Sequence, residues 1–176
     1  MNAPSPHGVR VRALLTGVAV PYSRPGKRSA IAKTPRAGKV YIGPLGLEGA
    51  EQADTRVHGG VDKAVHHYPF DHYAAWRAEL GDSPVLAEPG AFGENISTTG
   101  MDESNVCLGD RWTLGEAVLD VSQGRQPCWK LNDRFGVPDM ARRVQDTGRT
   151  GWYYRVLQAG AASAGDEIAL MERPFP

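Results

Sequence analysis

The fold can be worked out from one stretch, Leu108-Gly109-Asp110-Arg111-Trp112-Thr113-Leu114-Gly115-Glu116-Ala117-Val118-Leu119-Asp120-Val121. Apolar residues alternate with other residues on both sides of Gly115-Glu116, which is the pattern of two half-buried strands joined by a two-residue turn. A second Gly-Asp pair, Gly165-Asp166, precedes another alternating run that contains Ile168 and Leu170. Repeated Gly-Asp pairs ahead of alternating runs favour a barrel of antiparallel strands.

The rest of the chain is typical of a mostly β protein. It contains 21 glycines and 13 prolines, as expected for many short strands joined by turns. Further strands are predicted from Val9 to Val20, from Ile31 to Thr34, from Gly38 to Leu47 with a break at Gly43-Pro44, and from Gly151 to Leu157.

Two stretches have the spacing of helices. Tyr73, Trp76 and Leu80 recur at helical intervals after Pro69, so a helix is predicted from Pro69 to Leu80 with a buried aromatic stripe. A second helix is predicted over residues 138–147, and Gly148 is placed to end it.

Length and composition limit the classes of protein to consider. The 176 residues suit one domain, predicted at 9–176 after a flexible tail at 1–8. With 20 basic and 20 acidic residues the formal net charge is zero, so nothing supports binding to nucleic acid or to an anionic membrane. Two cysteines, no signal-peptide pattern and no apolar run of about 20 residues predict a reducing, cytoplasmic location.

The strand that ends at Val121 leads into a loop with a cysteine, Ser122-Gln123-Gly124-Arg125-Gln126-Pro127-Cys128-Trp129-Lys130-Leu131. Arg125 and Lys130 flank Cys128, and nearby cations favour a thiolate, which is both a nucleophile and a ligand for soft metals. A small buried apolar residue is the competing interpretation of Cys128. Cys107 has no adjacent cation and is expected to be a buried packing residue.

A second polar cluster surrounds a glycine pair. Arg56, His58 and Lys63 bracket Gly59-Gly60, and cationic side chains around exposed backbone N–H groups can form an anion cradle. An ordinary hairpin turn with solvated charges is the competing interpretation, and the local sequence alone favours it.

Two other patterns are weaker evidence for a site. The histidines at positions 58, 66, 67 and 72 occur without a Cys-x-x-Cys or His-Glu-x-x-His pattern, so they predict no zinc site. The segment Gly90-Ala91-Phe92-Gly93-Glu94-Asn95 offers a carboxylate and an amide. Its Gly-x-x-Gly spacing lacks the Lys-Ser/Thr of a phosphate-binding P-loop.

Four of these motifs, in this order, resemble the MOSC domain family. They are Arg56-x-His58-Gly59-Gly60-x-x-Lys63, Gly90-x-Phe92-Gly93-Glu94-Asn95, Leu108-Gly109-Asp110 and Gln126-Pro127-Cys128. Trp129-Lys130-Leu131 and the segment 150–157 look closest to the small stand-alone bacterial branch of that family, the YiiM type. The resemblance covers about residues 9–172 and implies a mostly β, closed barrel-like domain with a few peripheral helices. Gly124 departs from the proline that the family favours, which affects loop rigidity rather than chemistry.

The resemblance also implies a molybdenum cofactor (molybdopterin) site. Cys128 would be the protein ligand to molybdenum, and His58 is the candidate proton donor, since histidine titrates near neutral pH. The cofactor-binding residues carried over from the family pattern are Arg56, His58, Gly59, Gly60, Lys63, Asn95 and Arg125.

The activity that the resemblance implies is reduction of N-hydroxylated compounds, including hydroxylaminopurine-type base analogues. The chain has no flavin or iron–sulfur motif, so such a reductase needs an external electron-donor protein. Two other functions stay open: a sulfur carrier in which Cys128 forms a persulfide, and a non-catalytic module that binds or carries the cofactor. The sequence also leaves open a homodimer, the physiological substrate and the identity of the electron donor.

Overall fold

The computed structural model describes residues 8–53 and 59–176. Residues 1–7 of the predicted tail lie outside the described residues. So do Arg56 and His58 of the glycine-pair motif.

Within the described ranges, seven strands form a closed barrel. In barrel order these are β1 (Val9–Thr16), β8 (Ile96–Thr98), β7 (Val65–Pro69), β11 (Trp152–Gln158), β10 (Ala117–Gly124), β9 (Arg111–Leu114) and β13 (Glu167–Glu172). The barrel closes because β13 pairs with β9 on one side and with β1 on the other. The predicted mostly β, closed barrel is therefore confirmed.

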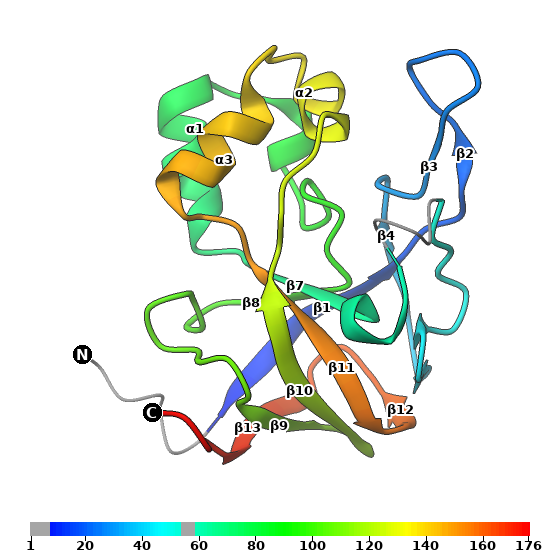
Figure 1. Cartoon of the computed structure of the whole chain (residues 1–176), viewed down its shortest axis with the longest axis vertical. Coiled ribbons are helices and arrows are strands. Elements are labelled where there is room, and N and C mark those ends of the chain that lie inside the picture. The colour runs from blue at the N-terminus through cyan, green and yellow to red at the C-terminus, as the bar shows by residue number, and fades with distance from the viewer. Residues whose placement is uncertain (1–7, 54–58) are drawn as a thin grey trace.

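The barrel strands pair antiparallel with their neighbours except for β7 and β8, which are parallel. A parallel pair cannot be joined by a tight turn and needs a crossover. Residues 70–95 form it, with helix α1 (His72–Leu80) and the 3₁₀-helix η2 (Pro84–Leu86). The crossover carries the chain beyond one end of the barrel, where the α-helices gather (Figure 1).

Shorter elements complete the fold. These are the hairpin β2 (Val20–Pro21) and β3 (Arg28–Ser29), the edge strand β4 (Thr34–Pro35) on β1, the small sheet of β5 (Val40–Gly43), β6 (Gly46–Leu47) and β12 (Gly160–Ala162), the 3₁₀-helix η1 (Val61–Lys63), and the helices α2 (Lys130–Phe135) and α3 (Met140–Thr147).

The two Gly-Asp pairs make the same turn, which explains their repetition in the sequence. The Asp110 carboxylate accepts the N–H of Cys107 at 2.9 Å, and the Asp166 carboxylate accepts the N–H of Ser163 at 2.8 Å. Each carboxylate thus closes a loop of three residues before a barrel strand. The adjacent glycines have φ of 81° and 91°, which an L side chain rarely adopts.

The buried apolar residues form two clusters. One fills the barrel and includes Leu14, Val65, Ile96, Trp112, Leu114, Leu119, Tyr154 and Ile168. The other lies between the helices and the strand ends and includes Tyr68, Tyr73, Trp76, Phe92, Leu131, Met140 and Val144. The predicted aromatic stripe of α1 is in this second cluster, where the Trp76 indole also donates to the Tyr68 hydroxyl at 2.7 Å. Packing against the second cluster stabilises short helices that would be unstable alone.

Several predicted boundaries differ from those of the structure. The first strand ends at Thr16 and not at Val20, which belongs to β2. The backbone passes close to Ala32 at Gly17, where an added Cβ would lie 2.4 Å from the Ala32 carbonyl oxygen. The predicted strand Ile31–Thr34 is wrong except for Thr34, which belongs to β4. Residues 30–33 are irregular instead, and the Ile31 N–H is bonded locally to Ser29 Oγ at 3.1 Å.

The helices also differ in detail. The first begins at His72 instead of Pro69, because β7 continues through Pro69 in its pairing with β8. The second predicted helix is confirmed as α3 and ends at Gly148, which has a left-handed conformation. The short helix α2 was not predicted. In the described part of the chain, no helix is long and apolar enough to cross a membrane.

Candidate functional site

A cavity of about 110 Å³ lies between the helices and the barrel, far larger than the ~10–15 Å³ that one water molecule needs. Its lining includes Ser29, Ala30, Ile31, Lys33, Glu51, Lys63, Phe92, Asn95, Arg125, Cys128, Lys130 and Tyr153. Among the described lining residues four are basic and one is acidic, although the whole chain has no net charge. Positive charge is therefore concentrated at this cavity, as in a binding site for an anion.

Cys128 and Arg125 are brought to the cavity by the end of β10. The Arg125 N–H donates to the Gly151 carbonyl at 3.1 Å, one residue after β10 ends at Gly124. The Cys128 carbonyl accepts the N–H of Leu131 at 3.1 Å and so forms the first turn of α2. The half-buried Cys128 thus lies between a strand end and a helix start, both fixed by backbone hydrogen bonds.

Arg125 is the most unusual side chain of the cavity. It is only 7% exposed, and its buried Nη1 has no hydrogen-bond partner among residues 8–53 and 59–176. Nearly all buried polar groups in proteins are paired, and an unpaired one costs about 1–3 kcal/mol. A guanidinium left in this state next to a cavity is well suited to receive an anionic group.

Lys63 reaches the cavity from η1, which follows the glycine pair. Gly60 has a φ of 92° and its carbonyl accepts the Lys63 N–H at 3.2 Å. The turn is attached to the barrel through Asp62, whose carboxylate accepts from Arg155 at 2.8 Å and whose carbonyl accepts from Ser122 at 2.5 Å. The described end of the motif, from Gly60 to Lys63, is therefore a turn that is attached to the barrel and presents Lys63. Gly59 and Gly60 are part of that turn and are not among the lining residues.

The glycine-rich segment before β8 forms another wall. A Cβ at Gly93 would lie 3.0 Å from Ile31 Cγ1, so glycine allows this segment to pack against residues 31–33. Asn95 lines the cavity and also joins two strands: its Oδ1 accepts the His66 N–H at 3.0 Å, and its Nδ2 donates to the Leu15 carbonyl at 3.1 Å.

Glu94 is fully buried behind that wall. Its carboxylate accepts the Tyr73 hydroxyl at 2.5 Å and the Phe92 N–H at 3.0 Å. Burial raises the pKa of Glu94, and the two hydrogen bonds act in the opposite direction. The carboxylate predicted for this motif is therefore part of the interior and not of the lining.

Lys33, Lys130 and Tyr153 belong to the cavity although they were not assigned to the site from the sequence. Burial raises the pKa of Tyr153, which keeps the phenol neutral, and its ring lies 5.9 Å from Lys63 Nζ. The alternation in the strand 152–157 could have predicted that Tyr153 points away from the barrel core, since Trp152 and Tyr154 are buried on the other face. Lys33 lies in the irregular segment that was predicted as a strand, so alternation gave no signal there.

The described histidines have structural roles. His67 is fully buried between the Tyr154 hydroxyl at 2.8 Å and Thr98 Oγ1 at 2.7 Å, and burial lowers its pKa to about 3. Burial, reinforced by Arg125, lowers the pKa of His66 well below its ordinary value. No group of three His, Cys, Asp or Glu side chains within 8–53 and 59–176 could hold a metal ion.

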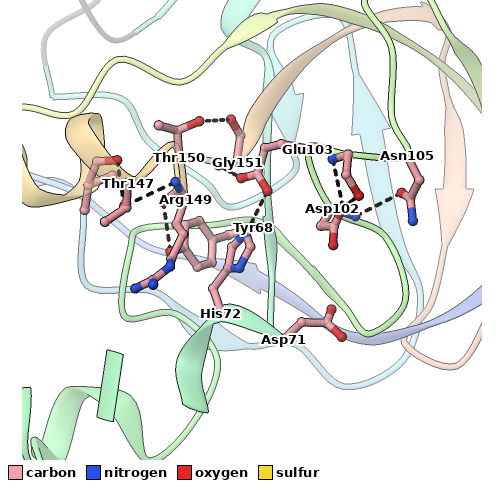
Figure 2. A network of polar contacts seen from close by, with 12 residues as sticks. Tyr68, Asp71, His72, Asp102, Glu103, Asn105, Thr147, Arg149, Thr150 and Gly151 are labelled. Carbon is pink, nitrogen blue, oxygen red and sulfur yellow. Dashed lines mark hydrogen bonds and ion pairs between the residues drawn. The ribbon is translucent and has the colours of Figure 1, made fainter. Parts of the chain in front are cut away.

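A polar network supports the Arg125 backbone from outside the cavity (Figure 2). Glu103 accepts the Gly151 N–H at 2.7 Å with one oxygen and pairs with His72 Nε2 at 2.7 Å with the other. The Gly151 carbonyl in turn accepts from Arg125. The loop before β9 and helix α1 thereby fix the strand end that presents Arg125 and Cys128.

The two cysteines differ in environment. Both are free thiols, and Cys128 lines the cavity whereas Cys107 does not. Cys107 is half-buried, so the prediction of a buried packing residue is wrong. The loop closed by Asp110 is at the surface, where Leu108 is 60% exposed.

Comparison with known proteins gives consistent results. The family model described as MOSC domain matches residues 54–169, more than half of the chain. Protein YiiM of Escherichia coli K12 is 48% identical over 84% of this chain and 66% of its own length. A protein of Gibberella moniliformis named Reductase is 48% identical over 84% of this chain, but the match covers only 26% of that protein. The crystal structure of YiiM from Geobacillus stearothermophilus superposes with a TM-score of 0.77 at 34% identity, over 94% of this chain and 76% of that one.

Proposed function

Because this chain belongs to the MOSC domain family, we propose that it is a molybdenum cofactor-dependent reductase of N-hydroxylated compounds. The observation that supports this most is the unpartnered Nη1 of Arg125 in a basic cavity that also contains the thiol of Cys128. The Reductase of Gibberella moniliformis supports a redox activity in the family. Since this chain spans about two thirds of the YiiM protein and a quarter of the Reductase, the activity of those whole proteins is here part of the proposal.

The residues of the cavity fit the chemistry of the cofactor. A thiolate is a soft ligand that suits a dithiolene-bound metal, so Cys128 would be the protein ligand to molybdenum. Lys63, Arg125 and Lys130 would pair with the phosphate, for which charge-assisted hydrogen bonds are strong. Arg56 and His58, which lie outside the described residues, would extend this set. When bound, the cofactor supplies two-electron redox chemistry that can cleave an N–O bond.

The contribution of the protein is to bind, orient and exclude water. Phe92, Ala30 and Ile31 give the cavity an apolar side, which strengthens the electrostatic contacts of the basic side chains. The turn at Gly60 and the strand end at Gly124 hold Lys63 and Arg125 in place before any ligand arrives. Such preorganisation lowers the cost of binding. The electrons would come from an external donor, because this sequence contains no flavin or iron–sulfur motif.

The test uses protein from cells that make the cofactor, beside protein from cells that cannot. We expect molybdenum in the first preparation only, and reduction of an aromatic hydroxylamine with an artificial electron donor. Cys128→Ser should lose the molybdenum and the activity while keeping the fold, since serine is nearly isosteric but is a harder, protonated ligand. Cys107→Ser is the matched control, because Cys107 is also a free thiol but lies outside the cavity.

Two results would redirect the assignment. If Cys128→Ser keeps its molybdenum and its rate, Cys128 is not the ligand. If wild type binds molybdenum and reduces nothing, the chain is a cofactor carrier. An extra sulfur on the intact mass that a reductant removes would favour the persulfide carrier instead.

A further inference from the structure

Lys33 is held at the cavity by the irregular segment between β3 and β4. Its Nζ donates to the carbonyl of Ala30, and its side chain is half-buried among the lining residues. The backbone of Lys33 also packs closely against Gly90, where an added Cβ would lie 3.0 Å from the Lys33 carbonyl oxygen. Glycine at this position thus lets the two segments approach, and Lys33 lies among the residues that line the cavity together with Cys128.

The charged groups that surround Lys33 come from three other parts of the fold. The carboxylate of Glu94 lies before β8, Arg125 follows β10, and α2 contributes Lys130 and Arg134. Burial lowers the pKa of Lys33 to about 8; the three cations lower it further and Glu94 opposes them. Lys33 is therefore charged at neutral pH, yet it releases its proton far more readily than an ordinary lysine, whose pKa is about 10.4.

We propose that Lys33 is the proton donor for the reaction in this cavity, an inference that rests on the function proposed above. In the overall reaction an N-hydroxylated substrate takes up two electrons and two protons, the N–O bond breaks, and an amine and water form. The external electron donor supplies the two electrons. Lys33 gives its proton to the departing oxygen and regains one from solvent.

Two other titratable side chains near Lys33, His66 and Tyr153, are less suited to this role. His66 is behind the lining, and burial keeps it neutral, so it has no proton to give near pH 7. Burial makes the Tyr153 phenol hold its proton more strongly than usual. A proton donor works best when its pKa is near the working pH, and the amine of Lys33 meets this condition.

The first experiment uses the cofactor-free protein and needs no activity. Lysines are dimethylated with ¹³C-formaldehyde, and their NMR signals are followed from pH 6 to 11, with Lys33→Arg identifying the Lys33 signal. We expect a midpoint near pH 8 for Lys33. A midpoint in the ordinary range near 10.4 would overturn the proposal.

The second experiment measures the loaded enzyme. Lys33→Arg keeps the positive charge but cannot release a proton, so it should retain molybdenum while its rate falls about 100-fold or more. The wild-type rate should decline at alkaline pH as Lys33 loses its proton, and the variant should lack this decline. Lys39→Arg is the control, because Lys39 is exposed and outside the cavity.

The outcomes separate the two proposals. If wild type and Lys33→Arg reduce the substrate equally, with the same pH profile, the role of Lys33 is refuted and the reductase function stands. If the molybdenum-loaded wild type reduces nothing, the reductase function fails, and the proton-donor role fails with it.

Discussion

At the scale of single residues, the side chain of Arg125 lowers the stability of the fold but favours the binding of an anion. Its guanidinium is buried, and its Nη1 is unpaired among the described residues. A buried unpaired donor is destabilising, and a bound anion would compensate it. The stability of the protein and its affinity for anions should therefore respond differently to a change at this residue.

We expect Arg125→Met to unfold no more easily than wild type, and to gain up to about 1 kcal/mol, because methionine fills a similar space without a buried charge. The same variant should lose the rise in melting temperature that pyrophosphate gives to wild type. Urea unfolding and thermal melts with and without pyrophosphate measure the two effects. Arg142→Met is the control, since its side chain is 82% exposed. A full pyrophosphate shift in Arg125→Met would contradict the assignment.

The sequence was informative about side chains whose position follows from regular structure. Cys128 and Arg125 follow a well-patterned strand, and the structure brings them together with Lys63 and Asn95 at one cavity. Lys33 could not be predicted, because its irregular path is set by contacts with the distant glycine-rich segment. Such long-range packing leaves no periodicity in the local sequence.

At the scale of elements, the junction before β11 connects the barrel to the cavity. Gly151 donates its N–H to Glu103 (Figure 2). Its carbonyl accepts from Arg125, and its φ is 69°. A Cβ at this position would lie 2.3 Å from the His67 carbonyl oxygen. The strand end therefore depends on a glycine for its conformation and also for its space.

We expect Gly151→Ala to cost about 3 kcal/mol or more in the free energy of unfolding, from a left-handed backbone and a clash with β7. Gly148→Ala is a matched control, because Gly148 has a φ of 72° but nothing within 4 Å of the added Cβ. It should cost only the conformational part, about 1–2 kcal/mol. Urea unfolding of both variants gives the comparison, and equal losses would show that the space at Gly151 is unimportant.

The predictability of the elements follows the strength of their patterns. The hairpin from Arg111 to Val121, the helix α3 and the break after Gly43 are as predicted, because each has clear periodicity and a glycine or proline at its boundary. Helix α2 has six residues and a single buried one, Leu131, so it has no periodicity to detect. The helix depends on tertiary packing, because Leu131 belongs to the second apolar cluster.

At the scale of the whole molecule, buried histidines make the stability depend on pH. His67 has its pKa lowered to about 3, whereas in an unfolded chain the value is about 6.5. Between these two values the unfolded state binds a proton that the folded state excludes. The contribution of His67 to stability is therefore complete above pH 6.5 and is lost as the pH falls toward 3.

We expect His67→Gln to flatten this dependence, because glutamine can bond to Thr98 and Tyr154 but cannot be protonated. The difference in slope should approach about 1.4 kcal/mol per pH unit between pH 6 and pH 4. Urea unfolding at several pH values measures it. Parallel curves for the two proteins would mean that His67 is not a neutral buried group.

The pairing of β1 with β13 also affects how the chain must be made. Residues 9 and 10 are synthesised well before their partners 168 and 167, which follow more than 150 positions later. At a synthesis rate of about 5–20 residues per second, β1 waits roughly 10–30 s for that neighbour. During this interval one sheet edge stays open to mispairing with other nascent chains. The barrel can close only after residues 167 and 168 have been synthesised, which makes this period a natural target for chaperones.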